Sequence, residues 1–210
     1  MPVIDHIVIA SADLDDGAAA FEASTGCALG PGGKHAMMGT YNRLCQSGNG
    51  TYCELVAVDP EAAAPSRPRW FGLSDPDVLA KIAVRPRAVA FIVGAEDLDR
   101  TIAASPVPLG PALSMNRGDL TWRVTVPDDG MPVEGGLVPG FIDWGGKPNP
   151  SAKLVDAGIE LRKIVASHPN PAALRDIYRA LEIDGLIEIV EGEVGLSFVL
   201  GTPGGEVVFD

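Results

Sequence analysis

The sequence is short of basic residues, and this shortage excludes several classes of partner. Only 16 lysines and arginines stand against 28 aspartates and glutamates, which gives a net charge of -12. Such a balance disfavours nucleic acid, whose phosphates attract a basic surface. It equally disfavours an anionic membrane surface. We therefore expect neither nucleic acid nor a membrane as a partner.

Long apolar runs and cysteines are also scarce. No run approaches the ~20 apolar residues that a membrane-spanning helix needs, and the first residues lack the basic and apolar regions of a signal peptide. The three cysteines, Cys27, Cys45 and Cys53, are an odd number, which favours reduced thiols and a cytoplasmic protein. Cys45 and Cys53 flank a predicted hairpin, and packing is their favoured role.

Glycine and proline, by contrast, are abundant, with 25 and 18 among 210 residues. This fits many short elements joined by turns. The first stretch predicts a β-branched strand, a helix that Ser11 or Asp13 caps and Gly26 ends, and a hairpin around Gly48-Asn49-Gly50. With one more short strand the unit is βαβββ. Its predicted strands are 3–9, 27–30, 39–46 and 51–58, and its helix is 13–25.

The same pattern returns 84 residues later. Glu96-Asp97-Leu98-Asp99 repeats Ala12-Asp13-Leu14-Asp15 after a strand, and a weaker third copy begins near residue 160. Internal repetition of this kind decides the fold before any single motif does. The later copies predict strands at 87–93, 119–126, 136–144, 160–166, 186–190, 194–200 and 205–209, and helices at 95–104 and 171–182.

Several strings sharpen the repeat into a resemblance to the glyoxalase-like domain family of the glyoxalase/bleomycin resistance/dioxygenase (vicinal oxygen chelate) superfamily. The resemblance implies an α+β fold in which βαβββ modules form curved, mostly antiparallel, cup-shaped sheets with helices outside. It implies a glyoxalase-like domain over 1–150, with modules at about 3–59 and 85–147 joined by a proline-rich connection, and a third, smaller module over 151–210. The strings are Ile4-Asp5-His6-Ile7-Val8-Ile9, Gly33-Lys34-His35, Gly39-Thr40-Tyr41-Asn42-Arg43-Leu44, Tyr52-Cys53-Glu54-Leu55, Arg69-Trp70-Phe71-Gly72-Leu73 and Leu120-Thr121-Trp122-Arg123.

In that superfamily a metal, where present, sits in the cup on ligands from the first and last strands of a module. Those positions are His6 and Glu54 here, and imidazole and carboxylate suit Zn, Ni, Fe or Mn. The second module departs from the pattern, because Ala90 occupies the position that corresponds to His6 after the shift of 84 residues. We therefore predict His6, His35 and Glu54 as the metal ligands, with Glu54 also as the catalytic base. A core histidine, a loop histidine and a Glu54 paired with Arg43 form the alternative.

Six further residues are predicted to bind substrate. Hairpin register decides which of two neighbours lies beside Glu54: a two-residue loop selects Arg43, and a three-residue loop selects Asn42. Arg123 either holds an anionic group of a ligand or pairs on the surface with Asp143. The predicted substrate-binding residues are Thr40, Asn42, Arg43, Trp122, Arg123 and Asp143.

Two functions follow from the resemblance. The first is a small-molecule enzyme, a metal-dependent isomerase, lyase or dioxygenase acting on vicinal oxygens. The second is a protein that sequesters a small molecule without chemistry, as in the bleomycin-resistance branch. The partner is a small-molecule ligand in both, and the sequence leaves a homodimer open.

Overall fold

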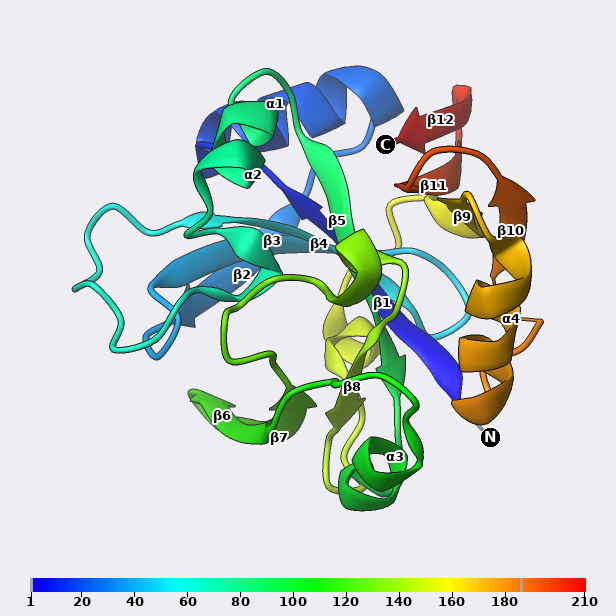
Figure 1. Cartoon of the computed structure of the whole chain (residues 1–210). Coiled ribbons are helices and arrows are strands. Elements are labelled where there is room, and N and C mark those ends of the chain that lie inside the picture. Colours follow the sequence, from blue (N-terminus) through cyan, green and yellow to red (C-terminus); the bar gives the residue numbers. More distant parts are fainter. Residues whose placement is uncertain (1, 186) are drawn as a thin grey trace.

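The computed structural model describes residues 2–185 and 187–210, which form two sheets with helices around them (Figure 1). The larger sheet has eight strands in the order β2-β3-β4-β1-β5-β8-β7-β6, and the smaller has four in the order β10-β9-β11-β12. The α+β class predicted from the sequence is confirmed.

The first module supplies half of the large sheet. Its helix begins where predicted, because the Asp13 side chain accepts from the amides of Asp15 and Asp16, and it ends at Gly26 with φ 71°. Such a left-handed residue is the usual helix stop. The module consists of β1 (Val3–Ala10), α1 (Leu14–Thr25), β2 (Gly30–His35), β3 (Thr40–Gln46) and β4 (Tyr52–Val58).

The second module repeats this order. Asp97 caps its helix by accepting from the Arg100 amide. The aspartates at the same place in the two repeated strings, Asp13 and Asp97, therefore both cap helices. The sequence missed β6, and the predicted connection 60–86 contains a helix, α2 (Pro76–Ile82). The module consists of β5 (Arg87–Gly94), α3 (Leu98–Ala104), β6 (Ala112–Arg117), β7 (Leu120–Thr125) and β8 (Gly140–Asp143), with short 3-10 turns at Trp70–Gly72, Val133–Gly136 and Pro150–Lys153.

The two modules join through their first strands. β1 and β5 pair antiparallel at the centre of the large sheet, while β1 pairs parallel with β4 and β5 pairs parallel with β8. The strand order of the first module is therefore repeated by the second module on the other side of the central pair. The outer strands curve toward each other, and the edge strands β2 and β6 come into contact. The predicted cup is the concave face of this sheet.

The third module keeps the element order but not the topology. β10 lies parallel and next to β9, so β9, α4 and β10 form a simple crossover unit, whereas β1 pairs with the last strand of its module. Its strands form a separate sheet and do not extend the large one. The elements are β9 (Glu160–His168), α4 (Pro171–Ala180), β10 (Glu188–Glu191), β11 (Gly195–Thr202) and β12 (Gly205–Phe209); residue 186, at the start of a predicted strand, lies outside the described residues.

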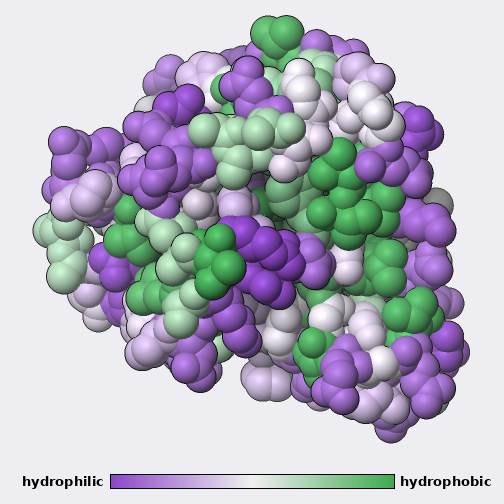
Figure 2. Space-filling view, turned by 90° about the horizontal axis from the view of Figure 1, so that it is seen from above, coloured by the Kyte–Doolittle hydropathy of each residue, from purple (hydrophilic) through white to green (hydrophobic). Residues whose placement is uncertain are grey.

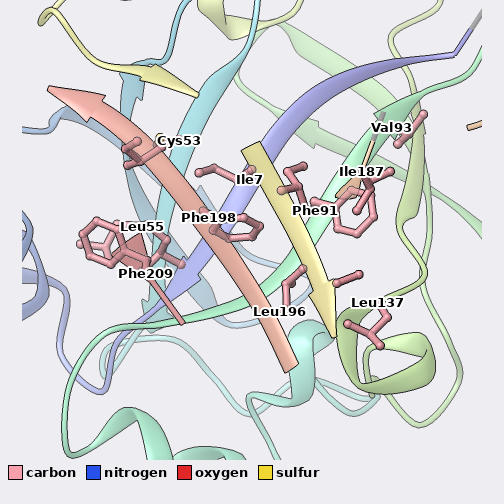
Figure 3. Packing of buried hydrophobic residues seen from close by; sticks show 14 of the residues in the cluster. Ile7, Cys53, Leu55, Phe91, Val93, Leu137, Ile187, Leu196, Phe198 and Phe209 are labelled. Atoms are coloured by element: carbon pink, nitrogen blue, oxygen red, sulfur yellow. The ribbon is translucent and has the colours of Figure 1, made fainter. Parts of the chain in front are cut away.

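The small sheet packs on the convex face of the large one. Figure 3 shows Phe198 and Leu196 of β11 facing Ile7 of β1 and Phe91 of β5. Tyr178 of α4 is fully buried there and donates its hydroxyl to the Leu137 carbonyl at 2.6 Å. One continuous apolar core thus joins the three modules and leaves the concave face to a second, separate cluster.

The structure also bears on two other features expected from the sequence, the cysteine pair and the lack of a membrane-spanning helix. Cys45 and Cys53 are register partners on β3 and β4, and both are buried free thiols. Within the described residues, no helix has the length and apolar character to cross a membrane. Figure 2 shows hydrophilic residues around much of the outline of one face, as the acidic composition requires.

Candidate functional site

The site begins with a bulge in β1 that brings two polar neighbours to one face. Where β1 pairs with β5, Ile4 is opposite Val93 and His6 is opposite Ile92, so Asp5 is an extra residue. An extra residue in one strand re-aims the side chains around it. Asp5 therefore reaches its neighbour, and its Oδ1 lies 2.7 Å from His6 Nδ1.

Asp5 is itself held by the segment that follows β8. Its Oδ2 accepts from Trp144 Nε1 at 2.9 Å and from Asn149 Nδ2 at 3.0 Å. His6 also stacks on Tyr52, with ring centroids 4.4 Å apart. The imidazole is fixed by a carboxylate at one edge and by a ring on one face, which leaves Nε2 toward β4.

The hairpin register decides which residue meets Glu54. Just beyond β3 and β4 the Ser47 amide still donates to the Thr51 carbonyl at 3.0 Å, so the turn has three residues, 48–50, and all three have a positive φ. This register places Asn42 in the cup, where its Nδ2 donates to Glu54 Oε1 at 2.6 Å. Arg43 points the other way and pairs with Asp15 of α1.

Glu54 and His6 form a buried pair. Glu54 Oε2 lies 3.4 Å from His6 Nε2, and each residue is 5% exposed. Burial alone would lower the pKa of His6, but hydrogen bonds with Asp5 and Glu54 and their charges raise it to about 9. Burial would raise the pKa of Glu54, but His6, His35 and Asn42 lower it to about 2. The pair is charged at neutral pH.

His35 adds a second imidazole, and its neighbours decide its tautomer. Asn42 Oδ1 accepts from the Gly33 amide and from Arg117, so the Asn42 nitrogen is a donor that also faces His35 Nε2 at 3.5 Å. A protonated Nε2 would meet another donor there. The proton therefore lies on Nδ1, which donates to Thr40 Oγ1 at 3.2 Å. His35 Nε2 keeps its lone pair toward the cup.

His35 lies in strand β2 and is buried, so it is not the loop histidine of the alternative interpretation. His35 is 4% exposed and packs edge-on against Trp70, with centroids 4.9 Å apart. Burial, together with the charges of Arg117 and His6, lowers its pKa to about 4, against the opposing charge of Glu54. His35 is a neutral, buried ring at neutral pH, and the glycines before it belong to strand β2.

Those glycines have a packing role that the sequence did not show. A Cβ on Gly32 would stand 2.0 Å from the Asn42 carbonyl oxygen, and a Cβ on Gly33 would stand 2.4 Å from Arg117 Cδ. Gly33 thus leaves room for Arg117 to cross from β6 and donate to Asn42 Oδ1 at 3.0 Å. The crossing links the two modules over the cup.

Five of the polar side chains described above line one small cavity of about 30 Å³, here called the polar cavity. Its polar members are His6, His35, Asn42, Glu54 and Arg117. Its walls are largely aromatic, and polar groups on a rigid aromatic background are typical of small-molecule sites. The aromatic wall residues are Tyr52, Trp70, Phe71, Trp122 and Trp144.

The predicted substrate-binding residues divide between the inside and the outside of the cup. Asn42 and Trp122 line the polar cavity, and Thr40 stands behind His35, also accepting from Trp70 Nε1 at 3.1 Å. Arg123 does not reach it, because its guanidinium binds both oxygens of Asp99 on α3 at 2.9 and 3.1 Å.

The other outward residue is Asp143. It accepts from the Gly145 amide at 2.7 Å in the turn after β8. Together with Arg43 and Arg123, it lies outside the polar cavity, and a role of these three residues in substrate binding stays a prediction. Strand alternation explains all three, because each neighbours an inward-facing residue along its strand.

The sequence analysis missed Asp5, Tyr52, Arg117 and Trp144 as parts of the site. Tyr52 had a signal, since it shares a strand face with Glu54. Asp5 had none, because alternation puts it opposite His6 and only the bulge overturns that. Arg117 lay in a stretch with no predicted strand.

No three His, Cys, Asp or Glu side chains among residues 2–185 and 187–210 meet the geometry of a metal site. His6, His35 and Glu54 line the same cavity, but the oxygens of Glu54 are taken by His6 and Asn42. The ligand set stays a prediction.

Comparison with solved structures shows the fold. A hypothetical protein from Staphylococcus aureus matches with a TM-score of 0.67 at 14% identity, covering 100% of this chain and 99% of that chain. Methylmalonyl-CoA epimerases from Streptomyces coelicolor and Mycobacterium tuberculosis match at 18% and 21% identity, with TM-scores of 0.43 and 0.44. They cover 68% and 71% of this chain and 97% and 89% of theirs, a likeness too weak to bear on function.

Sequence comparison gives the family. No curated protein matches the chain. The model of the glyoxalase-like domain family matches residues 4–182, which include both modules of the cup and the start of the third. The resemblance seen in the sequence is thereby confirmed, and the chain belongs to the glyoxalase-like domain family.

Proposed function

We propose that this protein is an enzyme that transforms a small, oxygen-rich molecule in the polar cavity. The observation that carries the proposal is the buried array in which Asp5 holds His6 and His6 faces Glu54. Strongly shifted pKa values of groups in a cavity mark functional sites more often than structural ones. Burying three charged groups is unfavourable for folding alone.

His6, His35 and Glu54 are the residues that would hold a divalent metal. Both imidazoles turn Nε2 inward while Nδ1 is anchored, to Asp5 and to Thr40, and ligating histidines are usually anchored in this way. The 3.4 Å between His6 Nε2 and Glu54 Oε2 equals the separation of two ligands placed about 2.1 Å from a tetrahedral ion. The donor types therefore fit a divalent ion, and the separation of His6 and Glu54 fits one pair of its ligands.

Such an ion would act as a Lewis acid on the vicinal oxygens of the substrate. The chain itself would supply the proton transfer through Glu54. While His6 is charged, it depresses the pKa of Glu54; with His6 neutral, this cause is gone and the carboxylate is a stronger base. Isomerase, lyase and dioxygenase chemistry all fit this arrangement.

A second candidate function is binding without chemistry. Its support is the closed hydrogen bonding of Glu54, whose two oxygens are satisfied by Asn42 and His6. A cavity with such an array and aromatic walls can hold a ligand without reacting with it. The three buried free thiols suit a reducing compartment in either case.

Elemental analysis of protein purified without a histidine tag separates the two candidates. The enzyme proposal expects close to one Zn, Ni, Mn or Fe per chain after incubation with each ion. Glu54→Gln should lower the metal content and slow turnover by about 10²- to 10⁴-fold. Glu22→Gln, an exposed change on α1, serves as the control. A parent protein that binds none of the four ions contradicts the metal mechanism.

A further inference from the structure

A second cavity adjoins the polar cavity and differs from it in chemistry. It has a volume of about 40 Å³ and lies between β5, β7, the 3-10 turn at Trp70–Gly72 and the segments before β6 and β8. We call it the apolar cavity. Its lining includes Trp70, Phe71, Ala90, Ile92, Val124 and Thr125.

No charged residue is among the described residues that line the apolar cavity. Only two of the lining side chains carry a nitrogen or oxygen, and both are already bonded. Trp70 Nε1 donates to Thr40, and Thr125 Oγ1 accepts from the Phe141 amide at 2.9 Å. A cavity whose side chains are this apolar favours apolar atoms over water.

The two cavities share a wall. Trp70, Phe71, Ile92 and Val124 line both of them. Phe71 is the half-exposed member and stacks on Trp70, with centroids 5.2 Å apart. Its φ of 58° is left-handed, a region where non-glycine residues are strained. The Phe71 side chain carries no polar atom and stands in the wall that the two cavities share.

We propose that the substrate is amphipathic, with an oxygen-rich head in the polar cavity and an apolar chain in the apolar cavity. The inference rests on the proposed function for the head and on the lining residues for the chain. The inference also gives a role to the second module. Ala90 occupies the position that corresponds to His6 of the first module, and its small side chain leaves space for the apolar chain of the substrate.

Titration calorimetry with straight-chain 2-oxo acids of four to ten carbons tests this. Affinity should rise about fourfold for each added methylene, as burial of one methylene predicts, and level off once the apolar cavity is full. Ala90→Leu should abolish this dependence and leave the shortest acid unaffected. Ala90→Val, a smaller change that keeps the fold if leucine does not, should flatten the dependence partly.

Ala104→Leu is the matched control, because it adds the same atoms on exposed α3, outside both cavities. It should behave as the parent protein. Equal affinity for all chain lengths, dependence retained in the Ala90 variants, or no binding of any acid would each overturn the inference. Saturated fatty acids give the same chain dependence without vicinal oxygens, so a failure of the metal mechanism alone leaves the chain result standing.

Discussion

The two modules of the cup share a topology and differ in chemistry. The first places His6, His35, Asn42 and Glu54 in the polar cavity, whereas the second contributes aromatic walls and a single cation, Arg117. The contrast is sharpest at the central strand pair, where His6 of β1 lies opposite Ile92 of β5. A repeated fold therefore does not require a repeated site.

The division has a physical reason. A second buried histidine and glutamate would need partners of their own, since unpaired buried charges are strongly destabilising. The second module instead presents Ala90, Ile92, Val124 and Ile142, which need only close packing. One half of the cup holds the charged groups other than Arg117, and the other half makes their surroundings largely apolar and so strengthens their interaction.

Replacing the central partners tests this division with the largest effect. His6→Ala should lower the free energy of unfolding by about 3–5 kcal/mol at pH 5.5, because it leaves two buried carboxylates without their cation. Ile92→Ala should lower it by about 2–5 kcal/mol through the lost packing. Urea unfolding of metal-free protein measures both, and only the first loss should depend on pH.

The sign of that dependence follows from the two shifted groups. The pKa of His6 is raised from 6.5 to about 9, so its stabilisation is complete below pH 6.5 and is lost as pH rises through 9. The pKa of Glu54 is lowered from 4.5 to about 2, so its stabilisation is present above pH 4.5 and is lost as pH falls through 2. If the His6→Ala variant still lost stability as the pH rises through 9, as the parent protein should, the assignment of His6 and Glu54 as a charged pair would be wrong.

His35→Ala should have the next largest effect. It should abolish stoichiometric metal binding, because His6 and Glu54 alone are two ligands and a catalytic site needs three. The substitution should also lower stability, because His35 is buried against Trp70. We expect a loss of about 1–3 kcal/mol from the vacated space and from the hydrogen bond that His35 makes to Thr40.

His168→Ala is the matched control for that experiment. His168 lies before α4, where its Nδ1 accepts from the Asn170 amide at 3.0 Å, far from the cup in the fold. Metal content of the two variants by elemental analysis, with thermal unfolding for stability, decides the matter. Full metal content in His35→Ala would remove His35 from the ligand set.

The fold could be predicted from the sequence further than the site could. Repeated acidic caps at Asp13 and Asp97 and β-branched strands are local signals, and they placed the helices of the first two modules and most strands correctly, although not α2. The topology of the third module depends on which strands pair, and no local signal encodes that. The same element order can therefore give a second sheet.

For the site, alternation placed His6 and Glu54 in one cavity, because each lies on a regular strand face. It could not find Asp5, since a bulge is set by pairing with β5 and not by β1 itself. Loop length decided between Asn42 and Arg43, and both loops were compatible with the sequence. The structure selected the three-residue loop.

Two arginines of the second module give the finest test of the contrast between the halves. Arg117 turns inward and donates to Asn42, whereas Arg123 turns outward and pairs with Asp99. Both belong to the hairpin of β6 and β7, so they differ mainly in which face they occupy. If the second module contributes one cation to the polar cavity, only Arg117 should matter for an anionic ligand.

Arg117→Ala should weaken the binding of a short 2-oxo acid by roughly tenfold, because a charge-assisted hydrogen bond to its carboxylate is lost. It should also raise the pKa of His35, since the charge of Arg117 is one of the causes that lower it. Arg123→Ala should leave both quantities unchanged, because exposed ion pairs contribute little. Calorimetry gives the affinity and NMR titration of the His35 ring gives the pKa. Equal effects of the two substitutions would mean that the inward position of Arg117 has no role in binding.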